Sequence, residues 1–234
     1  MKKRQLHFRY FQMWTALLLP SAVLVALLIW QAPDRHNPFT PIDLTDRPGL
    51  ATRHKLTHVQ RRPEACFKAL DDADVLYTRL DDSPAGETCG KYDALTLDRS
   101  LTPYSATLSM TCAQTATLYM WERHVARPAA IEIFGSPIVE IETFGSFSCR
   151  KIARSNRTSE HARANAIDIS GFVLANGRRI TVEGHWHKGG PEGAFLKRVR
   201  NGACRMFSVT LGPDYNADHA DHFHFDMGPG RACK

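Results

Sequence analysis

The chain has 234 residues, enough for one sizeable domain or two small ones, and it carries 30 Lys and Arg residues against 24 Asp and Glu residues. Four of the basic residues precede an uncharged apolar run near the N-terminus, and without them 26 basic side chains stand against 24 acidic ones. Domains that bind nucleic acid usually show a basic stripe and a strongly basic charge. The composition therefore argues against nucleic acid as a partner.

The N-terminal apolar run covers residues 13–30 and contains no charged side chain. At a rise of about 1.5 Å per residue, a helix of this length crosses most of the hydrocarbon core of a membrane. A cleaved signal peptide is the alternative, but the run is long for one and residues 31–35 offer no clear cleavage site. Transmembrane helices tolerate a proline such as Pro20. We predict that residues 1–31 form a cytoplasmic basic tail and a transmembrane anchor, so that the rest of the chain is exported.

The next segment, residues 32–62, is rich in proline and charge and has no sustained apolar period. This composition favours a flexible tether and places the start of the folded domain near Pro63. A loop is expected at residues 81–86, where aspartate, proline and glycine gather. Apolar spacing predicts helices over residues 67–70, 108–125 and 192–199. We expect Pro128 to end the second of them.

Strands are expected mainly in the second half of the chain. Residues 139–143 alternate apolar and charged side chains, which is typical of a strand with one buried face. Short apolar stretches predict three more strands, over residues 166–170, 179–182 and 223–225. Helices together with short antiparallel strands predict an α+β domain, a small antiparallel sheet flanked by helices.

Six cysteines lie beyond the apolar run, and none of them forms a C-x-x-C pair. In an oxidising compartment an even, scattered set of this kind predicts three disulfides. Fifteen pairings are possible for six cysteines. We expect neighbours in sequence to pair, which gives Cys66–Cys89, Cys112–Cys149 and Cys204–Cys233.

The segment from His219 to Asp226 has the alternation expected of a functional strand. Histidine and phenylalanine alternate from position 222 to Asp226, so the polar side chains share one face and both phenylalanines share the other. The phenylalanines can then pack in the core while His222, His224 and Asp226 line a cleft. Functional side chains held by such a rigid element are well positioned.

The second informative segment runs from Ser159 to Asp168. Asp168 lies within an apolar strand pattern, where an unpaired carboxylate would be costly to bury. His161 precedes it by seven residues, in a predicted loop that can bend to bring the two together. With a third ligand from the strand near His224, the set would hold a divalent metal and leave a fourth position for water.

Chance clustering is the alternative for these histidines, because the chain has 11 of them. A second H-x-H pattern, His185 and His187, shows how common such spacing is. Its polar, glycine-rich surroundings indicate a solvated turn rather than a metal site.

The two segments resemble the zinc peptidases that cut bacterial cell-wall peptides, a group that includes D-alanyl-D-alanine carboxypeptidases and the penicillin-insensitive murein endopeptidase. Ser159, His161, Ala166 and Asp168 fit the S-x-H-x-x-G-x-A-x-D pattern of that group, and His219, His222 and His224 fit its H-x-x-H-x-H arrangement. The resemblance implies zinc (Zn²⁺) held by His161, Asp168 and His224, in a fold shared with Hedgehog signalling domains. Ala164 replaces the glycine of the pattern, and we expect it to keep a negative φ.

From Pro63 to the C-terminus the chain also resembles the bacterial extensin-like C-terminal domain family. The likeness rests on Cys149 and Arg150 and on residues 166–172 and 211–224. The name of that family implies no proven reaction. The resemblances together imply a disulfide-stapled α+β domain over residues 63–234, with a metallopeptidase-like core at residues 149–226.

We therefore expect a zinc-dependent peptidase that acts on peptidoglycan stem peptides or cross-links at the periplasmic face of the inner membrane. His222 and His219 are the preferred catalytic residues, with Asp221 third, and Arg150 is a candidate for binding a substrate carboxylate. Ser159 is expected to orient its loop. One alternative is a zinc-containing wall-binding or interaction module without turnover, and another is a structural domain held by disulfides alone, without stoichiometric metal.

Overall fold

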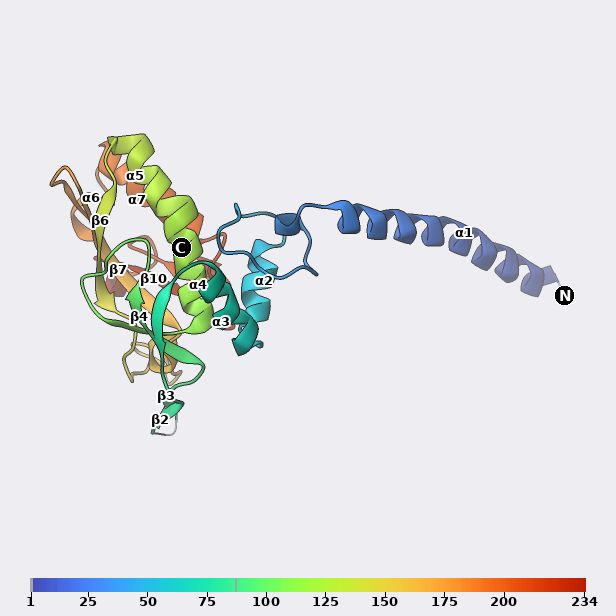
Figure 1. Cartoon of the computed structure of the whole chain (residues 1–234). Helices are drawn as coiled ribbons and strands as arrows, with labels where there is room; N and C mark the ends of the chain where they lie inside the picture. Colours follow the sequence, from blue (N-terminus) through green and yellow to red (C-terminus); the bar gives the residue numbers. More distant parts are fainter. Residues whose placement is uncertain (1, 87) are drawn as a thin grey trace.

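A computed structural model describes residues 2–86 and 88–234 and shows a long N-terminal helix that extends away from a folded domain (Figure 1). This helix, α1 (Lys2–Gln31), continues through Pro20. Its part Met13–Gln31 is long and apolar enough to cross a membrane, and its described side chains are largely exposed. The helix therefore suits the predicted membrane anchor, although signal sequences have the same length and composition.

The predicted tether is wrong for much of residues 32–62, which pack onto the domain. A short helix, η1 (Asp34–His36), is followed by α2 (Thr52–Val59), and both Leu44 and Leu56 are buried in the core. Lys55 donates its ammonium protons to three oxygens at 2.7–2.9 Å, two of them backbone carbonyls. The buried leucines of this segment are isolated among charged residues and show no helical or strand periodicity. The sequence therefore did not indicate that the segment packs on the domain.

The first part of the domain is a helix followed by small antiparallel sheets. Helix α3 (Pro63–Asp72) includes the predicted short helix, and the predicted loop at residues 81–86 contains a strand. The strands of this part are β1 (Leu76–Arg79), β2 (Ser83–Ala85), β3 (Cys89–Lys91), β4 (Ala94–Arg99) and β5 (Leu108–Thr111). They form one sheet in the order β1-β4-β5 and a separate β2-β3 hairpin.

The helix predicted over residues 108–125 is wrong at both ends. Residues 108–111 form β5, because Leu108 and Met110 alternate into the core and the strand pairs with β4. Helix α4 (Cys112–Trp121) begins where the Thr111 hydroxyl accepts a hydrogen bond from the Gln114 amide. It passes through a π-helical turn, η2 (Glu122–Ala126), into α5 (Arg127–Phe134). Pro128 does not end the helix, because it occupies the first turn of α5, where a missing N–H is tolerated.

The main sheet has the order β11-β9-β10-β7-β6, with β8 paired to β7. Its pairs are antiparallel except β11 with β9. Helix α7 (Gly190–Ala203) contains the predicted helix, and α6 (Val182–His185) is a short addition. The strands are β6 (Ile138–Gly145), β7 (Ala166–Leu174), β8 (Arg179–Thr181), β9 (Val209–Leu211), β10 (Phe223–Asp226) and β11 (Ala232–Cys233). The predicted α+β class is confirmed.

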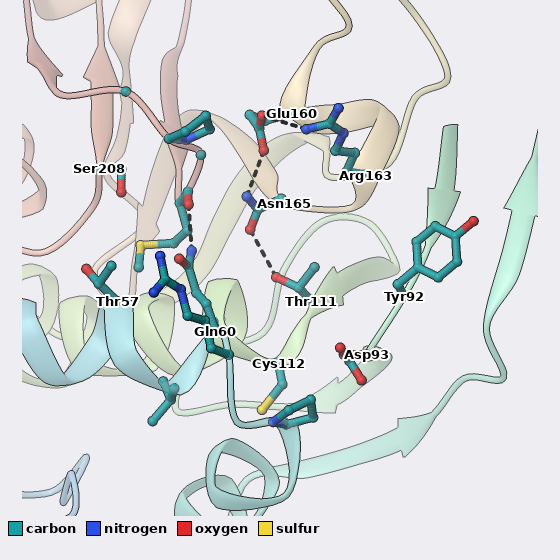
Figure 2. Close-up of a pocket in the computed structure, with 18 of the residues that line it drawn as sticks. Thr57, Gln60, Tyr92, Asp93, Thr111, Cys112, Glu160, Arg163, Asn165 and Ser208 are labelled. Atoms are coloured by element: carbon teal, nitrogen blue, oxygen red, sulfur yellow. Dashed lines mark hydrogen bonds and ion pairs between the residues drawn. The ribbon is translucent and has the colours of Figure 1, made fainter. Parts of the chain in front are cut away.

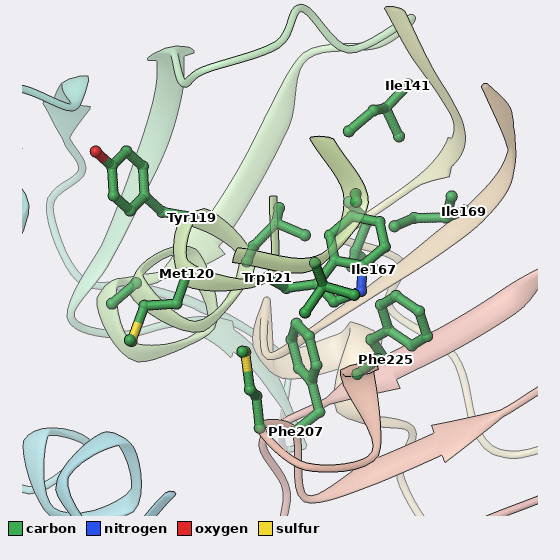
Figure 3. Close-up of a cluster of buried hydrophobic side chains, with 14 of the residues drawn as sticks. Tyr119, Met120, Trp121, Ile141, Ile167, Ile169, Phe207 and Phe225 are labelled. Carbon is green, nitrogen blue, oxygen red and sulfur yellow. The ribbon is translucent and has the colours of Figure 1, made fainter. Parts of the chain in front are cut away.

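The core joins α4 to one face of this sheet (Figure 3). The Trp121 ring of α4 lies 5.4 Å from the Phe225 ring of β10 and 6.2 Å from the Phe172 ring of β7. Its indole N–H donates to the Val199 carbonyl at 2.9 Å, so the buried polar atom is satisfied. Burying large aromatic side chains fixes β7 and β10 against the helix.

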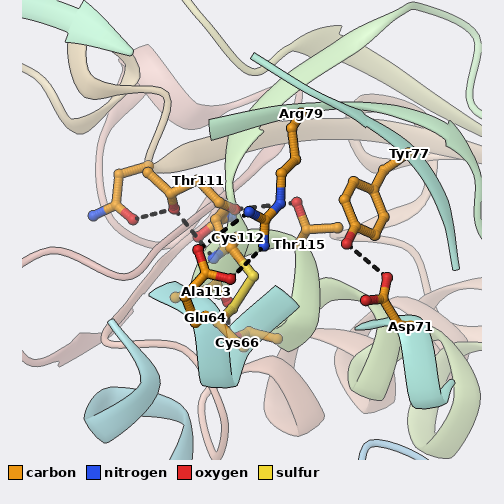
Figure 4. The surroundings of a disulfide bond; sticks show 12 residues. Glu64, Cys66, Asp71, Tyr77, Arg79, Thr111, Cys112, Ala113 and Thr115 are labelled. Carbon is orange, nitrogen blue, oxygen red and sulfur yellow. Dashed lines mark hydrogen bonds and ion pairs between the residues drawn. A yellow bond between two sulfur atoms is a disulfide. The ribbon is translucent and has the colours of Figure 1, made fainter. Parts of the chain in front are cut away.

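All six cysteines lie in the described part of the chain and are paired, as expected, but two of the three predicted pairings are wrong. The bonds are Cys66–Cys112, Cys89–Cys149 and Cys204–Cys233. Figure 4 shows Cys66 of α3 joined to Cys112 at the start of α4. The first two predicted pairings fail because Cys66 of α3 lies beside the start of α4, whereas Cys89 of β3 lies beside Cys149.

Glu122 is a fully buried carboxylate in the π-helical turn η2. It accepts hydrogen bonds from the Ser100 hydroxyl, the Thr102 amide and the Tyr104 hydroxyl at 2.6–3.1 Å. Burial raises the pKa of Glu122 to about 7, although these hydrogen bonds oppose the change.

Leu56→Ala should lower the free energy of unfolding by about 2–4 kcal/mol, since it removes a fully buried side chain of α2. Leu50→Ala is the matched control: Leu50 is 88% exposed, and its loss should cost less than about 0.5 kcal/mol. Urea unfolding of the chain without α1 measures both values. Equal effects would show that α2 is not part of the cooperative domain.

Glu122→Gln should make stability less dependent on pH. Because the folded-state pKa of Glu122 is raised to about 7, its contribution is fully present below about 4.5 and is lost as the pH rises through 7. The variant should therefore gain roughly 2–3 kcal/mol relative to the parent between pH 4.5 and pH 8. Urea unfolding at several pH values tests this, and parallel pH profiles would contradict it.

Candidate metal site

The backbone brings the predicted ligand residues together from three elements. In the antiparallel pair of β10 with β7, His224 stands opposite Asp168. His161 lies on the short 3-10 helix η3 (Glu160–Arg163) that precedes β7. The Ser159 hydroxyl accepts a hydrogen bond from the His161 amide at 3.3 Å and begins this helix, which is the orienting role expected of it.

Ala164 ends η3 in a left-handed conformation with φ of 54°, so the negative φ expected for this residue is wrong. Its carbonyl accepts a hydrogen bond from the Thr111 amide at 2.7 Å. The turn requires the left-handed conformation that glycine adopts without strain, and the alanine pays about 1–2 kcal/mol for it. The loop geometry associated with glycine is therefore retained without glycine.

Three acceptor atoms form a small triangle in the buried site. His161 Nε2 lies 3.1 Å from Asp168 Oδ1 and 3.0 Å from His224 Nδ1, and the remaining side of the triangle is 2.9 Å. All three residues are buried. Tetrahedral zinc ligands at about 2.0–2.1 Å from the ion lie roughly 3.4 Å apart. The triangle therefore fits zinc once its sides widen by a few tenths of an ångström.

In each ligand histidine, the ring nitrogen that points away from the triangle has its own hydrogen-bond partner. That partner determines whether the nitrogen that faces the triangle carries a proton or a lone pair. His161 Nδ1 lies 3.0 Å from the Ser146 carbonyl, and His224 Nε2 lies 2.9 Å from Asp226 Oδ2. Each neighbour is an acceptor, so each outer nitrogen carries a proton, and a neutral imidazole then turns its lone pair toward the triangle. The Gly228 amide donates to Asp226 Oδ1 at 2.8 Å and fixes that carboxylate.

A positive charge is needed where two lone pairs and a carboxylate meet. Burial raises the pKa of Asp168, but the interactions of its carboxylate with His161 and His224 outweigh burial and hold the pKa below the usual range. Burial lowers the pKa of His224, yet the Asp168 and Asp226 carboxylates raise it to about 9. Without a metal, a proton on His224 therefore supplies the charge. A divalent cation can replace that proton.

His222 lies beside the triangle in an orientation suited to proton transfer. Its Nδ1 donates to Asp221 Oδ1 at 2.8 Å, and its Nε2 is 3.6 Å from Asp168 Oδ1. The exposed Phe144 ring packs edge-on against the imidazole, with the ring centroids 5.6 Å apart. Asp221 therefore lies behind His222 rather than at the triangle.

His219 lies near both His222 and His224. The two ring centroids are 5.1 Å apart, and the His219 ring is 5.9 Å from that of His224. Its Nδ1 donates to the Asn216 side-chain oxygen at 2.7 Å. Burial, together with the neighbouring histidines, lowers the pKa of His219 to about 4, so this imidazole is neutral near pH 7.

Arg150 lies at the edge of the site, with its guanidinium 3.7 Å from Asp168 Oδ2. Half of its side chain is exposed, so the guanidinium is accessible from solvent. His185, from the second H-x-H pattern, instead lies in α6, and its Nδ1 is 3.1–3.2 Å from the backbone of Thr181, the N-cap residue of that helix. Only His161, Asp168 and His224 form a potential metal-binding cluster within the described residues.

Two groups orient the ligand histidines in ways that the sequence analysis did not predict. Asp226 was placed on the polar face by strand alternation, and its spacing of two from His224 was a usable signal. The Ser146 carbonyl that orients His161 had no sequence signal, because it is a backbone atom 15 residues away.

The comparison with family models identifies residues 64–234 as the family described as extensin-like protein C-terminus. This match begins one residue after the predicted domain start. No curated protein and no solved structure matches the chain.

Asp168→Ala should abolish stoichiometric zinc, because it removes the central acceptor of the triangle. Asp226→Asn should weaken zinc affinity about 10- to 100-fold, since it weakens the orientation of His224. Elemental analysis and competition with a chromogenic chelator measure both effects. Asp218→Asn is the control, because Asp218 pairs with Arg154 away from the triangle. Full zinc content in Asp168→Ala would exclude the site.

Proposed function

The chain belongs to the extensin-like protein C-terminus family, and we propose that it is a zinc-dependent peptidase that cleaves peptidoglycan stem peptides or cross-links. The observation that carries the proposal is the triangle of His161, Asp168 and His224, with His222 beside it. Three protein ligands and an open fourth position are typical of catalytic zinc sites, whereas structural zinc sites use four protein ligands.

Zinc in such a site lowers the pKa of a water molecule and polarises a carbonyl group. His222 is the first choice for general base, because Asp221 holds its Nδ1 proton and leaves Nε2 facing the site. The protonated imidazole then has the geometry to donate the proton to the leaving amine. His219 is a neutral second imidazole within reach, and Asp221 has the role of orienting His222.

Arg150 is proposed to bind a carboxylate of the peptide. Its half-exposed guanidinium beside Asp168 offers a planar fork at the edge of the site. Stem peptides carry free carboxylates near their scissile bonds, so this contact would orient the substrate. The resemblance of the two sequence segments to wall-cutting zinc peptidases, with their Hedgehog-like fold, supports the same substrate class.

The anchor and the disulfides support a periplasmic site. Basic residues precede the apolar part of α1, Met13–Gln31, which favours a cytoplasmic N-terminus in a single-pass inner-membrane protein. The domain would then lie on the opposite face. Its three disulfides persist in an oxidising compartment such as the periplasm.

Incubation of the zinc-loaded protein with purified muropeptides should release fragments that mass spectrometry identifies. His222→Gln should lower kcat about 10²- to 10⁴-fold while zinc content is unchanged, because it removes the general base and no ligand. His185→Gln is the matched control, since His185 of α6 contacts Thr181 of β8 and no member of the triangle.

Two outcomes would contradict the proposal. Failure of the parent to cleave muropeptides with several bridge types would exclude the peptidase, and zinc-dependent binding to wall sacculi would then favour the non-catalytic module. Equal kcat in the parent and His222→Gln would exclude His222 as the base.

A further inference from the structure

A cleft of about 910 Å³ lies beside helix α2, and Figure 2 shows part of its lining. Its walls come from α2, the hairpin strand β3, the first residues of α4, helix η3 and residues 227–231. Glu160 and Arg163 of η3 line this cleft, whereas His161 between them faces Asp168 and His224. The three members of the metal triangle are not among the residues that line it. The cleft is therefore a separate site.

The cleft carries more positive than negative charge. Four arginines line it, from α2 and the turn after α2, from η3 and from the C-terminal segment, and they are Arg53, Arg61, Arg163 and Arg231. The acidic side chains in its described lining are Asp93 and Glu160. Glu160 is already engaged, because it accepts from Asn165 Nδ2 at 2.7 Å and pairs with Arg163 at 3.8 Å. Within the described residues, no carboxylate lies within 4.0 Å of the other three arginines.

Arg53 is the least solvated of these arginines. Its guanidinium reaches two backbone carbonyls, of Cys204 and Ser208, at 3.4 Å each. Burial lowers the pKa of Arg53, and the like charge of Arg231 lowers it further. Two nearby guanidinium groups without a carboxylate repel each other, and an anion between them would relieve that repulsion.

The cleft is also rigidly built. The Gln60 side-chain amide donates to the Met227 carbonyl and links α2 to the C-terminal segment. Thr111 donates to the Asn165 side-chain oxygen at 3.1 Å, which links the start of α4 to η3 (Figure 2). Cys112 and Ala113, in the first turn of α4, line the cleft as well, so the positive end of the helix dipole adds to the arginine charge.

We propose that this cleft binds a small organic anion with at least two carboxylate or phosphate groups. Arginine forks match the geometry of both groups, and the arginines come from three separate segments, so a single anionic group would neutralise only part of the charge. Small-molecule sites commonly occupy about 300–1,000 Å³, and this cleft is in that range. The inference does not depend on the peptidase activity.

Calorimetric titration of the full chain in neutral detergent tests the proposal, with citrate and pyrophosphate as probes at constant ionic strength. We expect saturable binding of at least one probe at one site per chain, and none of acetate. Arg53→Gln/Arg231→Gln should weaken binding at least tenfold. Arg61→Gln/Arg231→Gln removes the same amount of positive charge from the cleft and should also weaken binding. Both residues are exposed, so their replacement does not disturb packing.

Two controls separate this site from the metal triangle and from general charge. Arg154→Gln/Arg157→Gln removes two exposed arginines outside the cleft and should leave the affinity unchanged. Citrate and pyrophosphate also chelate zinc, so the titration is repeated with Asp168→Ala, in which binding should persist. The proposal is overturned by the absence of saturable binding, by equal affinity in the cleft variants, or by loss of binding in Asp168→Ala alone.

Discussion

Two imidazole lone pairs and one carboxylate oxygen converge within 3.1 Å in the buried site, and the surrounding structure is arranged around this convergence. Three acceptors this close repel one another unless a proton or cation lies among them. The position of His161 depends on contacts that begin far away. Cys66 holds Cys112 at the start of α4, the adjacent Thr111 amide binds the Ala164 carbonyl, and Ala164 ends the helix that carries His161.

Strand β10 places its phenylalanines on one face, in the core, and its metal-site side chains on the other face. Phe225 packs against Trp121 and Phe207, and Phe223 packs against Trp186. Gln114 of α4 donates to the Phe225 carbonyl at 3.0 Å and ties the strand to the helix. The aromatic rings on the opposite face of β10 therefore fix the backbone that carries His224. The hydrogen bond to Asp226 fixes the orientation of the His224 ring. Rigid support of this kind would hold the ligands of a metal site in place before a metal binds.

Features that depend on neighbouring residues could be predicted from the sequence, whereas features that depend on residues distant in sequence could not. Strand alternation placed Phe223, Phe225 and His224 on their faces, because side-chain period needs only neighbouring residues. The apolar context of Asp168 likewise indicated a carboxylate that requires compensation. Two of the three disulfide pairings, the tether that contains Leu44 and the helix expected over residues 108–111 were predicted wrongly, because each depends on a partner distant in sequence. The pairing of Cys204 with Cys233 was predicted correctly. The left-handed Ala164 is held by a distant amide in the same way.

Helix η3 and the segment after β10 are shared between the metal triangle and the arginine cleft. His161 faces the triangle while Glu160 faces the cleft, and Asp226 orients His224 while Gly228 lines the cleft. Gly228 allows close packing, since a Cβ there would lie 2.7 Å from the Glu160 carboxyl carbon. The close approach of Glu160 to Gly228 therefore connects the short helix that carries His161 with the segment that follows Asp226.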